Sequence, residues 1–182
     1  IECDLDSLEA YAAFRAEAEL TRMRHFLEVF NPAFDIGIGP ADLPFYINDC
    51  IVRSLAGLVS AERPLFLKMQ YNGARAMVEL AAYDPGNLVV GILGGAKGTT
   101  RDTFELVSQA EKHGARVALF GRKINLAEAP VDLVAMMRRV IERSVSPAEA
   151  VKAYHGRLAE LGLKPTLALE SDLEITDPVL RG

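Results

Sequence analysis

The sequence predicts an α/β fold, half of a TIM (β/α)₈ barrel, on two observations. Four short apolar strands alternate with helices along the chain, an order typical of parallel βα units with right-handed crossovers. Two neighbouring strands also carry a charged residue at mid-strand, which packing alone rarely explains. On a barrel strand such charges point inward near the carboxyl end, where barrel enzymes place their chemistry.

The apolar spacing assigns each element in order. Helices are expected at residues 7–23, 42–59, 74–83, 102–113, 130–143 and 146–161, and strands at 25–30, 65–71, 88–93 and 116–120. Ser146, Pro147 and Glu149 are typical of a capped helix start. The tail beyond Gly162 has two prolines and no clear period, so it is expected to be loosely attached. We therefore predict one domain, a half barrel over 1–145 followed by a C-terminal helix and tail over 146–182.

The first two strands share a pattern in which one face carries aromatic and charged residues. This face holds Phe26, Glu28 and Phe30 in the first strand and Phe66, Lys68 and Gln70 in the second. The central strands of an open doubly wound sheet are covered on both faces and are usually apolar throughout. The pattern therefore favours a barrel over an open sheet.

Lys68 is the first candidate for chemistry. A lysine among Phe66, Leu67 and Met69 would be partly desolvated, which favours the neutral amine that Schiff-base formation requires. Glu28 would project into the same cavity and could accept and return protons. The alternative is a structural ion pair between the two side chains, and the pattern is compatible with both.

A glycine-rich loop after the third strand has the composition of a phosphate site. Glycines let the backbone approach an anion, and the N-terminus of the following helix offers free N–H groups. Gly121 and Arg122, after the fourth strand, would add donors. The candidate residues of the loop are Gly94, Gly95, Ala96 and Lys97. The Walker spacing is absent, and tight turns without a ligand would explain the same glycines.

The remaining reactive side chains suggest no further site. We expect His25 to be a core histidine, His113 to lie at a helix C-terminus and His155 to lie at the surface. Cys3 and Cys50 lie far apart and are expected to be reduced thiols. Because no cluster has metal-ligand spacing, no metal is expected.

Composition and charge exclude several classes of partner. The net charge is −5, whereas nucleic-acid binding needs clustered Lys and Arg. No apolar run reaches the roughly 18 residues that a bilayer span requires, and the N-terminus lacks the regions of a signal peptide. We therefore expect a cytoplasmic protein without nucleic-acid or membrane partners. The chain lacks a starting Met and begins in what reads as the end of a strand, so we expect it to be cut from a larger protein.

Four segments, taken in order, resemble the second half of the class I, Schiff-base aldolase superfamily. They are Phe-Leu-Glu-Val-Phe (26–30), Leu-Lys-Met-Gln-Tyr-Asn-Gly (67–73), Gly-Ile-Leu-Gly-Gly-Ala-Lys-Gly-Thr-Thr (91–100) and Ala-Leu-Phe-Gly-Arg-Lys-Ile-Asn (118–125). The closest branches are the archaeal-type fructose-bisphosphate aldolases and the tagatose-bisphosphate aldolases, and deoxyribose-phosphate aldolase is more distant. The segments also resemble a less characterised bacterial set of related barrel proteins.

This resemblance implies that the chain supplies about strands five to eight, the C-terminal half of the barrel. It implies that Lys68 forms the imine, that Glu28 assists proton transfer, and that phosphate is bound by Gly94, Gly95, Gly121 and Arg122. The implied activity is a carbon–carbon lyase of carbohydrate metabolism that acts on a phosphorylated sugar without a cofactor. Two alternatives stay open, a phosphosugar isomerase or epimerase with Glu28 as its base, and a non-catalytic sugar-phosphate-binding relative.

The chain also departs from the family pattern. The first four strands are absent, and with them the family's acidic residue on strand one. Lys97 and Gly98 enlarge the phosphate loop. A half barrel exposes two sheet edges, so we expect a homo-oligomer or pairing with the missing N-terminal half, and the chain alone could be inactive.

Overall fold

The computed structural model describes residues 2–181, and across these residues four parallel strands form one sheet. The strands are β1 (Leu27–Val29), β2 (Phe66–Met69), β3 (Val89–Leu93) and β4 (Val117–Leu119). Their order is β1-β2-β3-β4, so each strand pairs in parallel with the next along the chain. The α/β class and the parallel sheet are therefore confirmed.

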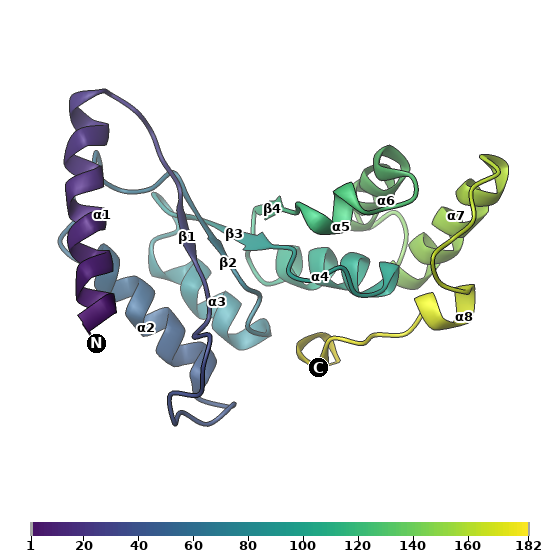
Figure 1. Cartoon of the computed structure of the whole chain (residues 1–182), viewed down its shortest axis with the longest axis horizontal. Helices are drawn as coiled ribbons and strands as arrows, with labels where there is room; N and C mark the ends of the chain where they lie inside the picture. Colours follow the sequence, from purple (N-terminus) through teal and green to yellow (C-terminus); the bar gives the residue numbers. More distant parts are fainter. Residues whose placement is uncertain (1, 182) are drawn as a thin grey trace.

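Helices precede, connect and follow the strands (Figure 1). They are α1 (Glu2–Leu20), α2 (Leu43–Leu55), α3 (Ala74–Tyr83), α4 (Thr100–Lys112), α5 (Arg122–Asn125), α6 (Pro130–Ile141), α7 (Pro147–Glu160), α8 (Leu169–Asp172) and the 3₁₀ helix η1 (Pro178–Leu180). The expected start of the chain in a strand is wrong, because the described residues begin in α1. The short elements α5, α8 and η1 were not expected, since a single turn carries too little apolar periodicity to detect.

Local chemistry sets the helix ends. α4 begins at Thr100, two residues before the expected start, because Thr99 and Asp102 form a reciprocal capping box. Ser146 and Glu149 form the expected one at α7. α2 stops at Leu55 and not at 59, since the chain turns at Gly57 with φ of +79°, a conformation that favours glycine.

The core lies against one face of the sheet. Leu67, Met69, Val90 and Ile92 alternate toward this face and are at most 2% exposed. They belong to one cluster with apolar side chains of the helices, among them Ile51, Leu80 and Phe104. On the opposite face Phe26 is 46% and Val89 is 38% exposed. The sheet is thus covered by helices on one face and largely open on the other.

The C-terminal third forms a helical layer at the end of the molecule away from α1 (Figure 1). α4, α6 and α7 pack against one another, and Phe104, Val151, Tyr154 and Leu158 are at most 1% exposed between them. This layer positions the loops that follow β3 and β4.

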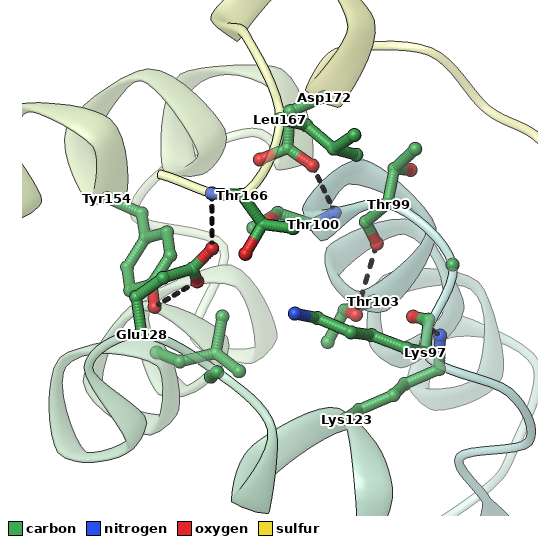
Figure 2. Close-up of a pocket in the computed structure, with 13 residues that line it drawn as sticks. Lys97, Thr99, Thr100, Thr103, Lys123, Glu128, Tyr154, Thr166, Leu167 and Asp172 are labelled. Atoms are coloured by element: carbon green, nitrogen blue, oxygen red, sulfur yellow. Dashed lines mark hydrogen bonds between the residues drawn. The ribbon is translucent and has the colours of Figure 1, made fainter. Parts of the chain in front are cut away.

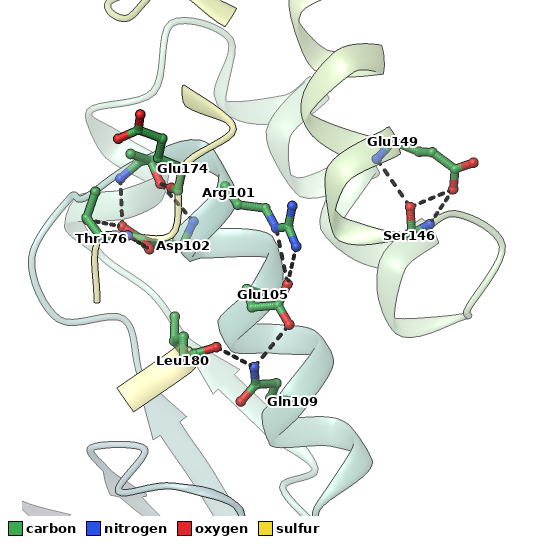
Figure 3. Close-up of polar contacts among 10 residues, drawn as sticks. Arg101, Asp102, Glu105, Gln109, Ser146, Glu149, Glu174, Thr176 and Leu180 are labelled. Carbon is green, nitrogen blue, oxygen red and sulfur yellow. Dashed lines mark hydrogen bonds and ion pairs between the residues drawn. The ribbon is translucent and has the colours of Figure 1, made fainter. Parts of the chain in front are cut away.

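The C-terminal tail is not loosely attached, and that expectation is wrong. The backbone N–H groups of Thr176 and Asp177 donate to Asp102, and Gln109 donates to the carbonyl of Leu180 (Figure 3). Leu180 is 2% exposed. The tail therefore runs back along α4 and is fixed there by polar contacts that leave no periodic signal in the sequence.

No helix among the described residues is long and apolar enough to cross a membrane.

Candidate functional site

Lys68 and Glu28 meet on the open face of the sheet. They occupy paired positions of β2 and β1, and Lys68 Nζ lies 2.8 Å from Glu28 Oε1. Their side chains are 23% and 30% exposed. Phe26 and Phe66 stack beside them with ring centroids 4.9 Å apart and an interplanar angle of 6°. The sheet register thus builds a half-buried ion pair with an aromatic wall.

On the other side of Lys68, β3 contributes Gly91, its register partner. A side chain at Gly91 would not fit, because a Cβ there would lie 2.6 Å from the carbonyl oxygen of Leu67 and 3.2 Å from Cβ of Val117. The glycine therefore allows β3 to pack closely against its neighbouring strands beside Lys68.

Lys68 was expected to be desolvated by Phe66, Leu67 and Met69, but two of these side chains lie on the other face of the sheet. Leu67 and Met69 belong to the opposite, helix-covered face and are 0% and 2% exposed. Phe66 lies on the same strand face as the lysine, and Glu28 Oε1 lies 2.8 Å from its ammonium nitrogen. This arrangement is compatible with proton exchange and also with a structural role.

An amide cluster at the carboxyl ends of β1 and β2 was not anticipated. The backbone N–H of Asn31 donates to Gln70 Oε1 at 2.9 Å, and the side chains of Asn31 and Asn72 bond reciprocally at 2.8 and 3.1 Å. Asn31 and Asn72 follow directly after the expected strands 25–30 and 65–71. Gln70, which shares the strand face of Lys68, was the signal that could have revealed a polar site there.

The predicted phosphate residues fall into two groups. Gly95, Ala96, Lys97, Gly121 and Arg122 are at least partly exposed, after the carboxyl ends of β3 and β4. Gly94 is buried, and a Cβ there would lie 3.0 Å from the ring of Phe120. Gly94 is thus explained by packing, and phosphate binding by the loop stays a prediction.

Carboxylates already accept several N–H groups at the N-terminus of α4. Thr99 donates from its backbone to Asp102 Oδ2 at 3.1 Å, and Thr100 donates to Asp172 Oδ1 at 2.7 Å. Asp102 N–H bonds the hydroxyl of Thr99 at 3.0 Å. An anion approaching this helix end would therefore compete with the protein's own carboxylates.

Lys97 lines a cavity of about 160 Å³ at this end of α4 (Figure 2). Across from it Glu128 accepts hydrogen bonds from the backbone of Thr166 at 2.7 Å and from the Tyr154 hydroxyl at 3.2 Å. Burial opposes ionisation of Glu128, but the hydrogen bonds from Thr166 and the charge of Lys97 outweigh it and lower the pKa of Glu128 to about 2. Burial, reinforced by the negative charge of Glu128, raises the pKa of Tyr154 to about 12. The cavity thus holds a carboxylate that is charged at neutral pH.

Lys123 lies at the edge of the same cavity. It is only 6% exposed, and its ammonium donates to the carbonyl oxygen of Lys97 at 2.9 Å. Burial lowers its pKa, although the charges of Asp102 and Asp177 act in the opposite direction. This lysine fixes the loop that carries Lys97, a role that sequence spacing did not indicate.

The expectations for two of the three histidines need correction. His155 is not at the surface, because its side chain is 11% exposed and its Nε2 lies 2.8 Å from Asp172 Oδ2 in the tail. His25 has the expected polar partner, since the Tyr11 hydroxyl lies 3.1 Å from its Nε2, but it is half-buried beside α1 and not in the core. His113 caps the C-terminus of α4, as expected.

The side chains that the structure describes include one free cysteine and several acidic residues away from the Lys68–Glu28 pair. Cys50 is a free, exposed thiol, and Cys3 lies outside the side chains that the structure describes. Within those side chains, no group of three or more His, Cys, Asp or Glu residues is placed to hold a metal ion.

No family model and no curated protein matches the sequence. The resemblance to class I aldolases therefore rests on the four segments quoted above, and the function is argued from the geometry of the site.

Proposed function

We propose that the chain is half of a (β/α)₈ barrel and acts as a class I aldolase-like lyase on a phosphorylated sugar, through a Schiff base on Lys68. One observation carries the proposal: Lys68 Nζ and Glu28 Oε1 lie 2.8 Å apart at mid-strand on the open face of the sheet. A nucleophilic amine and a proton acceptor within hydrogen-bond reach are what imine chemistry needs.

The pair supports a balanced sequence of steps. Lys68 passes a proton to Glu28, and the neutral amine adds to the substrate carbonyl carbon. The proton held by Glu28 converts the alkoxide of the adduct into the hydroxyl of the carbinolamine. Glu28 then takes one of the two remaining N–H protons and passes it to this hydroxyl, which leaves as water. The resulting iminium accepts the electron pair of the breaking carbon–carbon bond, while Glu28 takes the proton of the substrate hydroxyl that becomes the aldehyde. No metal or cofactor enters these steps.

The strand order supports the barrel. In a barrel each parallel strand pairs with the next along the chain, whereas a doubly wound sheet reverses its order at a switch point. The order β1-β2-β3-β4 contains no reversal. A second set of four strands, from another copy of this chain or from preceding sequence, would cover the open face and both edges.

The loops after β3 and β4 support a phosphorylated substrate. Gly95 adopts φ of +66°, and it lies with Gly121 and Arg122 at the carboxyl side of the sheet, where barrel enzymes bind phosphate. Arg122 is exposed and offers a planar fork of donors suited to a phosphate group.

Borohydride trapping tests the imine. The protein is incubated with dihydroxyacetone phosphate and borohydride, and the intact mass and peptide map are measured. We expect an adduct on Lys68 that Lys68→Met abolishes and that Lys152→Met leaves unchanged, because Lys152 is an exposed lysine on α7. Glu28→Gln should slow adduct formation by about 10²-fold, the usual contribution of a general acid–base group.

Other outcomes identify the alternatives. Turnover of a phosphosugar without any adduct, lost in Glu28→Gln, would favour an isomerase or epimerase. Saturable binding without adduct or turnover, and insensitive to Lys68→Met, would leave only the binding role. Either result would refute the Schiff-base mechanism.

A further inference from the structure

A second candidate site lies apart from the Lys68–Glu28 pair, in the cavity of about 160 Å³ beside α4. We call it the Glu128 pocket, and its polar side chains are those of Lys97, Thr99, Thr100, Thr103, Lys123, Glu128, Tyr154, Thr166 and Asp172. Neither Lys68 nor Glu28 lines it. Its walls come from the loops after β3 and β4, from α4 and α7, and from the C-terminal tail (Figure 2).

The pocket holds opposite charges that do not neutralise each other. Figure 2 shows the Lys97 side chain extending into the space between Thr103 and Glu128. Lys97 and Glu128 are not among the ion pairs of the described residues, although they are close enough for Lys97 to lower the pKa of Glu128. An ammonium and a carboxylate that face one cavity without touching leave room for a group between them.

Residues of the pocket wall hold the Glu128 carboxylate and the backbone of Lys97 in place. Glu128 is fixed by Thr166 and Tyr154, whose hydroxyl in turn accepts from Ala129 N–H at 3.0 Å. The backbone of Lys97 is fixed by the buried ammonium of Lys123. These contacts pre-position the Glu128 carboxylate and the backbone that carries Lys97, so a ligand would have only the Lys97 side chain to order on binding.

The volume and the lining residues of the pocket limit the size and the chemical groups of a ligand. A cavity of about 150 Å³ is known to accommodate a molecule of benzene size, so the Glu128 pocket fits a compound of three or four carbons with one anionic group. The anion would pair with Lys97. Because the Glu128 carboxylate can only accept hydrogen bonds, the other end of the ligand must donate them, as hydroxyl groups do.

We propose that the Glu128 pocket binds a small hydroxylated organic anion, with its carboxylate or phosphate on Lys97 and its hydroxyl groups on Glu128. The site is independent of the Schiff-base proposal. The tail forms part of it, since Thr166 fixes Glu128, and Leu167 and Asp172 line the wall.

Thermal unfolding and calorimetric titration with defined probes test this proposal. Glycerol 3-phosphate and glycerate carry both features, inorganic phosphate carries only the anion, and glycerol carries only the hydroxyls. We expect saturable binding and a raised unfolding midpoint with glycerol 3-phosphate or glycerate, at concentrations where phosphate and glycerol have little effect. The tighter of the first two identifies the anionic group.

Variants tie the binding to the pocket. Lys97→Met should weaken binding at least about tenfold, since it removes a charged hydrogen-bond partner. It should fold normally, because Figure 2 draws no hydrogen bond from the Lys97 ammonium to the other residues of the pocket. Glu128→Gln should reduce the preference for the hydroxylated probes over inorganic phosphate. Lys152→Met and Lys68→Met should bind as the parent does, and the latter separates this site from the aldolase site.

Two results would overturn the proposal. The first is no saturable binding of either hydroxylated probe. The second is binding that inorganic phosphate reproduces with equal affinity, or that survives Lys97→Met, because the two-ended recognition would then be wrong. Both results leave the borohydride experiment on Lys68 unaffected.

Discussion

Glu128 is a carboxylate whose ionisation is coupled to folding. Its pKa is lowered from an ordinary value of 4.5 to about 2, because the hydrogen bonds from Thr166 and the charge of Lys97 exceed the effect of burial. A carboxyl whose pKa is depressed on folding stabilises the protein above its unfolded pKa and loses this contribution as the pH falls through the folded one. Its contribution should therefore be complete above about pH 5 and disappear between roughly pH 4.5 and 2.

Glu128→Gln tests this coupling. We expect the variant to be less stable than the parent at pH 7, and the difference to shrink as the pH falls toward 2. The free energy of unfolding, measured by urea titration between pH 7 and 2, gives the comparison. Asp102, whose pKa is also lowered, changes stability in the same direction in both proteins and cancels in the difference. A difference that stays constant with pH would contradict the lowered pKa.

The contact between Lys68 and Glu28 could be predicted from the sequence, whereas the contact between Glu128 and Tyr154 could not. Lys68 and Glu28 could be paired because strand alternation fixes which face a residue takes, and two neighbouring strands shared the pattern. Glu128 and Tyr154 lie 26 residues apart and meet through a helix and a loop. Their contact depends on how α7 packs, and no local spacing encodes it.

The N-terminus of α4 depends on a residue that links the helix to the tail. Asp102 is 3% exposed and accepts from the backbone of Thr99, from the backbone and hydroxyl of Thr176, and from Asp177 N–H (Figure 3). A carboxylate here satisfies free donors and also suits the positive end of the helix dipole.

Asp102→Asn should release the tail. The amide nitrogen would face donors, leaving buried N–H groups unsatisfied, and we expect a loss of about 3 kcal/mol in unfolding free energy. Limited proteolysis should then cut between residues 163 and 181 faster than in the parent. Asp49→Asn is the matched control, because Asp49 forms an exposed pair with Arg53 and should change stability by less than about 1 kcal/mol. Equal protection of the tail in Asp102→Asn would contradict this account.

At the scale of elements, apolar periodicity and capping residues predicted the bounds of one helix and the start of another. The helix at 74–83 was predicted with both ends correct, and Ser146 and Glu149 revealed the start of α7. The attachment of the tail was not predicted, because it depends on single polar residues that form hydrogen bonds with buried groups of α4. Such contacts follow from tertiary structure and leave no periodic pattern in the sequence.

At the scale of the whole molecule, one face of the sheet is left uncovered by helices. It presents Phe26 at 46% and Phe30 at 67% exposure, next to the half-buried Lys68–Glu28 pair. Its edges are β1 and β4. Unpaired strand edges beside exposed apolar side chains favour association. Two copies related by a two-fold axis that runs along the strands, on the open side of the sheet, would place β4 of one copy beside β1 of the other. The eight strands would then all be parallel.

Self-association through this face is therefore expected for the chain studied alone. Sedimentation velocity should show an average mass that rises toward twice the monomer value with concentration. Phe26→Glu should shift the equilibrium to monomer, because a carboxylate would be buried without a partner in the associated state. Val131→Glu is the control, since Val131 is 82% exposed on α6, away from the sheet. If the parent stays monomeric at all concentrations, or if both variants weaken association equally, the open face is not the contact between copies.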